Sequence, residues 1–240
     1  MRLTDTHTHH TRHNALVDID PVTLRMSSPG HSRNGDSTGK NAIFQRGYTY
    51  SVGIHPWNCL QANRKDLLML RALAAEPCVK AIGETGLDTI HKVTGSQEGD
   101  CLSDSQNGHT DLLKMQTELL RYHVALSEEL RKPLILHIVK QFGEIIRLKR
   151  ELRPTQPWII HGFRGKPEVA KELLRHGFYL SYGEKFNPAS VAVTPPSRLL
   201  IETDESQLPV SVIAKRLTTA GIAPKPRKFG TLDGGMGENA

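Results

Sequence analysis

The chain has 240 residues, of which 38% are hydrophobic and 23% are charged, and its formal net charge at pH 7 is +6. This length is sufficient for one α/β barrel, and the composition excludes a fibrous or a wholly disordered protein. The surplus of cationic residues favours an anionic partner such as a nucleic acid, although basic residues scattered over helices are also typical of an ordinary solvated surface.

Short apolar runs recur along the chain and predict eight strands. In chain order they cover residues 3–6, 16–19, 48–54, 79–83, 133–136, 158–160, 178–182 and 199–203. Runs of this length, bounded by Gly, Pro and polar residues, are typical of strands buried in a parallel sheet.

Helical periodicity separates several of these strands. It covers residues 66–75, 112–131, 142–152 and 167–176. Strands that alternate with helices predict a parallel sheet, and eight of them predict a single-domain (β/α)₈ barrel of the TIM type. Because no helical pattern separates the first two strands, we expect a distorted barrel.

Two long polar segments, residues 27–41 and 89–110, are rich in Gly, Ser, Asn and Asp and are predicted to be loops. Both follow predicted strands, so both are expected on the catalytic face of the barrel. On that face, the segment 89–110 is either a lid over the site or an insertion without function. Residues 221–240 contain little apolar material and predict an unstructured tail, which assigns residues 1–220 to the barrel.

The chain shows no sign of export or of membrane insertion. No run approaches the ~20 apolar residues that span a bilayer, and no apolar stretch precedes the first histidines, so we expect a cytoplasmic protein without signal peptide or anchor. Cys59, Cys78 and Cys101 lie far apart and form no C-x-x-C, which predicts free thiols rather than disulfides or a thiolate zinc site.

Potential metal ligands follow or end the apolar runs. They are His7, His9, Glu84, His137, His161 and Asp204. Because the C-terminal strand ends line the mouth of a parallel barrel, we expect these side chains to meet there. The two-residue period of a strand places His7 and His9 on one face. Four imidazoles and two carboxylates suit Zn²⁺, Mn²⁺ or Fe²⁺, and Mg²⁺, which prefers more oxygen ligands, is the further alternative.

Around these residues lie short motifs in a fixed order along the chain. They are Asp-Thr-His-Thr-His (5–9), Gly-Ile-His-Pro-Trp (53–57), Ala-Ile-Gly-Glu-Thr-Gly-Leu-Asp (81–88), Lys-Pro-Leu-Ile-Leu-His (132–137), Ile-His-Gly-Phe-Arg-Gly (160–165) and Ile-Glu-Thr-Asp (201–204). In these motifs the chain resembles the TatD family of metal-dependent deoxyribonucleases, part of the amidohydrolase superfamily. It departs from the family in its long segment 89–110 and in a helical pattern that fades after Leu217.

The resemblance implies a metal-dependent hydrolase that cleaves the phosphodiester bonds of DNA. We hypothesise a centre of two divalent ions. One is held by His7, His9 and Asp204 and the other by His137 and His161, with Glu84 bridging the two. A metal-activated water would attack the phosphodiester. Catalytic roles then fall to Glu84 and Asp204, the latter as the acceptor of the water's proton or as a plain ligand.

Four further residues are candidates for substrate binding: His55, Lys140, Arg164 and Lys185. Each follows a predicted strand, and Arg164 lies inside a TatD-like motif, placed to clamp a phosphate with two hydrogen bonds. The alternatives are a structural loop histidine and ordinary surface charge. The low aromatic content gives no sign of a row of residues for stacking bases.

Two other functions are compatible with the pattern. One is a hydrolase of an amide, ester, lactone or aminoacyl-tRNA bond on the same scaffold. The other is a binding protein that keeps the barrel without catalysis. The TatD-like motifs and the cationic residues favour the phosphodiesterase, and no protein partner is inferred.

Overall fold

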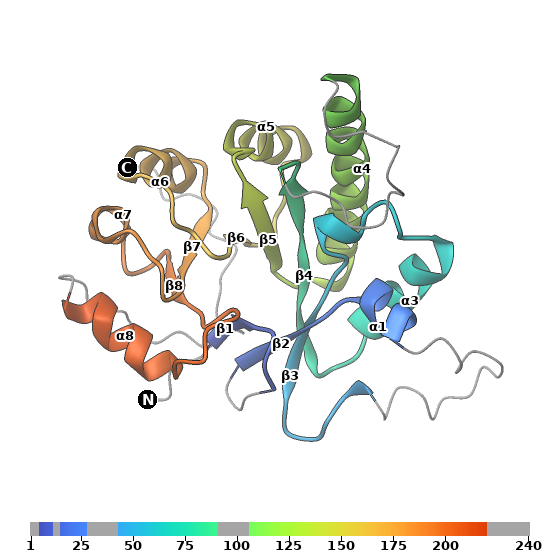
Figure 1. Cartoon of the computed structure of the whole chain (residues 1–240), viewed down its shortest axis with the longest axis horizontal. Coiled ribbons are helices and arrows are strands. Elements are labelled where there is room, and N and C mark those ends of the chain that lie inside the picture. Colours follow the sequence, from blue (N-terminus) through green and yellow to red (C-terminus); the bar gives the residue numbers. More distant parts are fainter. Residues whose placement is uncertain (1–4, 12–14, 28–42, 91–105, 220–240) are drawn as a thin grey trace.

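The computed structural model describes residues 5–11, 15–27, 43–90 and 106–219. Eight strands form one parallel sheet, in which each strand pairs with the next along the chain (Figure 1). They are β1 (Asp5–Thr8), β2 (Ala15–Ile19), β3 (Thr49–Val52), β4 (Val79–Asp88), β5 (Leu134–Val139), β6 (Trp158–Ile160), β7 (Tyr179–Tyr182) and β8 (Leu199–Ile201). The predicted distorted barrel is confirmed.

Strands β1 and β8 bring the two ends of the sheet together. A parallel bridge joins Thr8 to Asp204, and the Asp204 N–H donates to the His7 carbonyl at 3.0 Å. Beside this bridge, the buried Asp5 carboxylate accepts hydrogen bonds from the Thr203 N–H at 3.0 Å and from its hydroxyl at 2.6 Å. The first and last candidate ligands of the chain therefore become neighbours.

Helices pack around the outside of the strands. They are α1 (Pro21–Ser27), the 3₁₀ helix η1 (Pro56–Asn58), α3 (Arg64–Ala74), α4 (Gln106–Leu130), α5 (Phe142–Leu152), α6 (Pro167–Arg175), α7 (Pro188–Ala192) and α8 (Val210–Thr219). Asn63 and Asp66 form a capping box that starts α3, and Pro167 occupies the first turn of α6. The four predicted helices are present with small shifts. Helices α1, η1 and α7 were not predicted, and α8 covers the region where the sequence showed a helical pattern that fades after Leu217.

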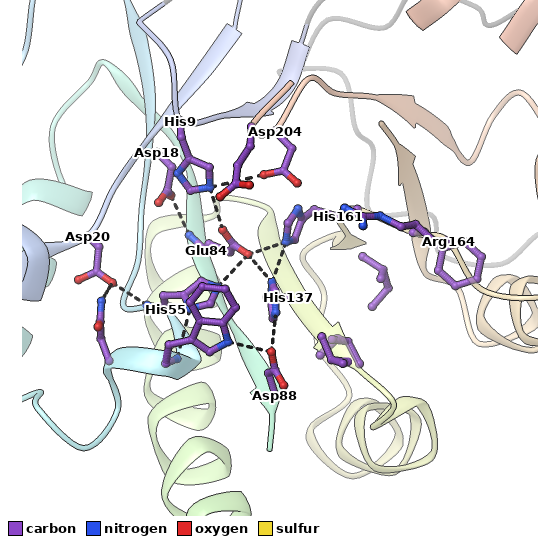
Figure 2. Close-up of a pocket in the computed structure, with 18 of the residues that line it drawn as sticks. His9, Asp18, Asp20, His55, Glu84, Asp88, His137, His161, Arg164 and Asp204 are labelled. Carbon is purple, nitrogen blue, oxygen red and sulfur yellow. Dashed lines mark hydrogen bonds and ion pairs between the residues drawn. The ribbon is translucent and has the colours of Figure 1, made fainter. Parts of the chain in front are cut away.

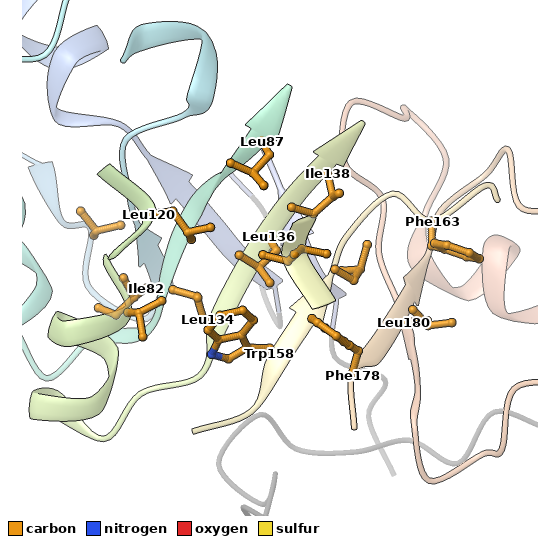
Figure 3. Packing of buried hydrophobic residues seen from close by; sticks show 14 of the residues in the cluster. Ile82, Leu87, Leu120, Leu134, Leu136, Ile138, Trp158, Phe163, Phe178 and Leu180 are labelled. Carbon is orange, nitrogen blue, oxygen red and sulfur yellow. The ribbon is translucent and has the colours of Figure 1, made fainter. Parts of the chain in front are cut away.

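The apolar core has two parts. A large cluster lies between the strands and the helices and includes Leu120, Leu134 and Trp158 (Figure 3). A smaller layer takes one residue from each of six strands: Leu16, Ala81, Ile135, Ile159, Tyr179 and Leu200. Because side chains alternate along a strand, His137 and His161 share the face of Ile135 and Ile159, two residues earlier. The smaller layer therefore underlies the candidate ligands.

Three candidate ligands lie within strands rather than after them, so the strand ends predicted at Thr6, Gly83 and Leu136 were wrong. His7 lies inside β1, Glu84 inside β4 and His137 inside β5. Gly83 and Gly86 have positive φ, and a Cβ on either would collide with the carbonyl oxygen of its neighbour on β5. These glycines therefore allow the close contact between β4 and β5 on either side of Glu84.

The polar segments also differ from prediction. Helix α1 separates β2 from the segment 27–41, so that segment follows a helix, and α4 begins at Gln106 inside the segment expected to be loop. Residues 28–42, 91–105 and 220–240 lie outside the described residues. The lid, the insertion without function, the unstructured tail and the boundary at residue 220 therefore stay predictions.

Two other predictions concern cysteines and membranes. The thiols of Cys59 and Cys78 are free, as predicted, and Cys101 lies outside the described residues. In the described part of the chain, none of the helices combines the length and the apolar character needed to cross a bilayer.

Candidate metal centre

Glu84 lies at the centre of the candidate site, buried among histidines from three other strands (Figure 2). Its Oε1 is 2.8 Å from His137 Nδ1 and 2.5 Å from His161 Nε2. Its Oε2 is 3.1 Å from His7 Nε2 and 3.7 Å from His9 Nε2. The two oxygens of one carboxylate thus face two separate pairs of imidazoles.

Asp204 joins the first of these pairs. Its Oδ1 lies 3.5 Å from His9 Nε2 and 3.9 Å from His7 Nε2, and its side chain is 20% exposed. The residue has a φ of 53°, which turns the chain sharply after β8. His7, His9 and Asp204 form one grouping with the spacing of metal ligands, and His7, Glu84 and His161 form another. The structure therefore brings all six candidate ligands together.

Two buried carboxylates orient the histidines on β5 and after β6. Asp88 Oδ2 is 3.2 Å from His137 Nε2, so the other nitrogen of that ring faces Glu84. Glu202 Oε1 lies 3.5 Å from His161 Nδ1 and leaves Nε2 of that ring toward the site. Carboxylates in such positions fix the tautomer and raise the basicity of metal-binding histidines. Sequence reasoning missed both roles, although the two residues stand in the quoted motifs.

Two aspartates of the β2 segment, also missed, hold the backbone of the site. Asp18 Oδ1 accepts the Glu84 N–H at 2.9 Å and the Ser51 hydroxyl at 3.1 Å. Asp20 Oδ2 accepts the His55 N–H at 2.8 Å. The pattern Asp-Ile-Asp at the end of β2 places both carboxylates on the side of the site, and it is the sequence signal that would have identified them.

His55, predicted as a substrate contact, lies among the candidate metal ligands. Its Nδ1 accepts the Trp57 N–H at 3.2 Å, and its Nε2 is 3.3 Å from Glu84 Oε1. His55, Glu84 and His137 form a further grouping with ligand spacing. The ring therefore borders the second histidine pair.

The electrostatics of the site favour positive charge. Burial opposes a charge on His7, yet the Glu84 carboxylate raises the pKa of His7 to about 9. For His161, burial again lowers the pKa, but Glu84 and Glu202 raise it well above its usual value. Burial tends to raise the pKa of Glu84, while His161 and His7 hold it well below its usual value.

The donors present fit divalent metal ions. The ring of His7 is fully buried, its Nδ1 has no hydrogen-bond partner among the described residues, and its Nε2 lies 3.1 Å from Glu84 Oε2 without the alignment of a hydrogen bond. Such atoms are costly unless something coordinates them. Imidazole nitrogens and carboxylate oxygens are suitable ligands for Zn²⁺ and Mn²⁺, and a cation would supply the charge that the site otherwise obtains by protonation.

The site opens into a cavity of about 950 Å³. His55, Lys140 and Arg164 line this cavity, and the side chains of Lys140 and Arg164 are exposed. Lys185 lies instead in an adjoining cavity of about 440 Å³, which shares Arg164 and Asp204 with the first. Three of the four predicted substrate contacts thus border the site directly, and Lys185 does not.

Comparison with known proteins places this arrangement in a family. The profile of TatD-related DNases matches residues 4–210. The chain belongs to the TatD-related DNase family. It is 29% identical over 219 residues to YabD of Bacillus subtilis, an uncharacterised metal-dependent hydrolase, an alignment that covers 84% of this chain and 79% of YabD.

Two other relatives are similarly distant in sequence. YcfH of Escherichia coli strain K12, also an uncharacterised metal-dependent hydrolase, is 31% identical over 78% of this chain and 65% of its own length. The 3'-5' ssDNA/RNA exonuclease TatD of Cronobacter sakazakii is 27% identical over 80% of this chain and 68% of its own.

A solved structure of YjjV, a TatD homologue from Escherichia coli K12, shares the fold with this chain. The TM-score is 0.56 at 18% identity, and the alignment covers 86% of this chain and 83% of YjjV.

Proposed function

We propose that this chain is a metal-dependent phosphodiesterase that acts on DNA through a pair of divalent ions, Zn²⁺, Mn²⁺ or Mg²⁺. The proposal depends on one observation, that Glu84 directs its two oxygens at separate histidine pairs. One ion would be held by His7, His9 and Asp204, and the other by His137 and His161. Glu84 would be a ligand of both ions. The names of the relatives, metal-dependent hydrolases and a nuclease, support this choice.

Each part of the site then has a chemical task. Bound divalent ions would lower the pKa of a water and neutralise charge on the phosphate. Asp204, at the edge of the cavity, accepts the proton of the attacking water. Arg164 and Lys140 hold the phosphate from the cavity wall, while Asp88 and Glu202 keep the imidazoles in the tautomers that face the site.

The direct test is hydrolysis by metal-stripped protein to which single metals are returned. The substrates are labelled single-stranded DNA, labelled duplex DNA and a small phosphodiester, each with Mg²⁺, Mn²⁺ or Zn²⁺. We expect cleavage with at least one ion, and fragment lengths distinguish removal of terminal nucleotides from internal cutting.

Two variants accompany this test. Glu84→Gln keeps the shape but loses the charge and should abolish most of the activity, whereas Glu118→Gln, on the exposed side of α4, should not. Hydrolysis of an ester or an aminoacyl-tRNA, with no phosphodiester cleaved under any metal, would replace this proposal by the alternative hydrolase.

A further inference from the structure

Trp57 is an exposed aromatic residue beside a charged site. It lies in η1, directly after the loop that carries His55, and its side chain is 37% exposed. It borders the same cavity as Glu84, His137 and Arg164. The mechanism above gives this ring no task.

The indole is held in a defined orientation. Its Nε1–H donates to Asp88 Oδ2 at 2.8 Å. The His55 ring meets it edge to face at a centroid distance of 4.5 Å, and the His137 ring does so at 5.7 Å. Pro56 stiffens the backbone before it, and the His55 side chain accepts its N–H. A ring fixed in advance loses little conformational freedom when a ligand binds.

We propose that Trp57 stacks against a nucleobase of the substrate, next to the phosphate that undergoes hydrolysis. This inference rests on the proposed function, because it assigns a second contact to the same nucleotide. In a nucleotide, one sugar separates the base from the phosphate. In the site, the ring of His137 lies between Trp57 and Glu84, because it contacts both. A base on Trp57 would therefore lie close to a phosphate at Glu84. A single ring is sufficient for one base, so the low aromatic content is no obstacle.

The hydrogen bond from Trp57 to Asp88 also determines how Trp57 could recognise a base. The one donor of the indole is given to Asp88, so the ring can contribute its exposed aromatic surface but no hydrogen bond to a base edge. Stacking tolerates every base, because each has a π-face. We therefore expect a requirement for a base with little preference among the four.

Trp57 could also affect activity by a second route. Its N–H donates to Asp88, and Asp88 contacts the candidate ligand His137, so a test of stacking must separate the two effects. Trp57→Phe keeps an aromatic face and loses the N–H, whereas Trp57→Ala loses both. The two variants therefore distinguish stacking from the support of Asp88.

The kinetic test compares metal-loaded native protein with both variants on two substrates. One is a short oligothymidylate and the other is an abasic phosphodiester chain of equal length. The native ratio of kcat/KM between them should be roughly 5- to 100-fold in favour of bases. Trp57→Phe should keep most of this ratio and Trp57→Ala should reduce it toward one. A native ratio near one, or a ratio unchanged in Trp57→Ala, overturns the inference.

A binding test needs no turnover, and so separates this inference from the proposed activity. The chain has two tryptophans, and the other, Trp158, is fully buried. Adding dAMP to metal-loaded protein should quench Trp57 emission, while deoxyribose 5-phosphate should not, and Trp57→Phe should show neither response. Equal effects of the two phosphates, or no effect of dAMP, would refute stacking whether or not DNA is cleaved.

Discussion

Glu84 owes its position to its neighbours as much as to its own strand. Gly83 and Gly86 let β4 approach β5 closely, and Asp18 fixes the backbone N–H of Glu84. A glutamate without this support would lose the alignment of its two oxygens with the two histidine pairs. The same arrangement explains why a carboxylate so deeply buried keeps its charge, since imidazoles surround it on both sides.

Replacement of Asp204 by Asn tests its proposed role as proton acceptor. The amide keeps an oxygen near His9 but accepts a proton poorly, so kcat on a small phosphodiester should fall by roughly 10²–10⁴. Metal content, measured by elemental analysis, should stay close to that of the native protein. Full turnover with both ions bound would leave Asp204 as a plain ligand.

Replacement of Arg164 by Ala tests the phosphate contact. Arg164 lines the cavity without belonging to the ligand groupings, so KM for DNA should rise roughly tenfold while metal content stays unchanged. Arg150→Ala, an exposed arginine on the outer surface of α5, is the matched control and should leave KM as it is. An Arg164 variant with the native KM would end the clamp hypothesis.

At the scale of residues, the sequence identified the six candidate ligands but not the residues that hold them. The candidate ligands can be recognised in the sequence by their residue type and by their position near strand ends. Asp18, Asp88 and Glu202 look like ordinary polar residues in the sequence, because their role depends on contacts with other strands. Such contacts join strands far apart in the chain. Only the folded geometry shows which ring nitrogen each carboxylate occupies.

At the scale of elements, a buried histidine ties α4 to the loop that carries His55. His123 Nε2 accepts the Ile54 N–H at 2.9 Å, and its Nδ1 lies 2.8 Å from the Leu119 carbonyl oxygen, to which it donates. The Nε2 contact requires a neutral ring, because a protonated Nε2 has no lone pair with which to accept the Ile54 N–H. Burial lowers the pKa of His123 to about 4, below its usual value of 6.5.

This tie predicts a pH-dependent stability. Between pH 6.5 and pH 4 the unfolded chain binds a proton at His123 and the folded chain does not, so the free energy of unfolding falls as the pH falls. At pH 4.5 the loss from this group should be roughly 2–3 kcal/mol. Urea unfolding at pH 7 and pH 4.5 should show this loss in the native protein and not in His123→Gln. Equal losses in both proteins would exclude the tie as the cause.

The predicted elements were confirmed where periodicity is long and failed where it is short. Helix α5 matches its prediction from Phe142 to Leu152, because 11 residues give a clear apolar stripe. Helix α7 has five residues, too few for a pattern. The fourth strand was predicted to end at Gly83, because the apolar run stops there, whereas β4 continues to Asp88.

At the level of the whole molecule, the parallel barrel brings residues from His7 to Asp204 to one rim, and the net charge of +6 sets the long-range field around it. Arg164 and Lys140 border the cavity and Lys185 lies next to it. Three phosphate contacts on a single strand correspond to a salt exponent of about −2. KM for DNA should therefore rise roughly 10- to 20-fold between 50 and 200 mM salt, and a KM independent of salt would count against these contacts.

The most direct measurement is the number of metal ions that the protein binds and how that number depends on Glu84. Metal-stripped native protein and Glu84→Gln should be titrated with Mn²⁺ and with Zn²⁺ by calorimetry, and the bound metal counted by elemental analysis. We predict two ions for each native chain and markedly weaker binding of at least one of them in Glu84→Gln. A native chain that takes up no ion or only one, or a variant that binds two as tightly as the native protein, would contradict the proposed two-ion centre.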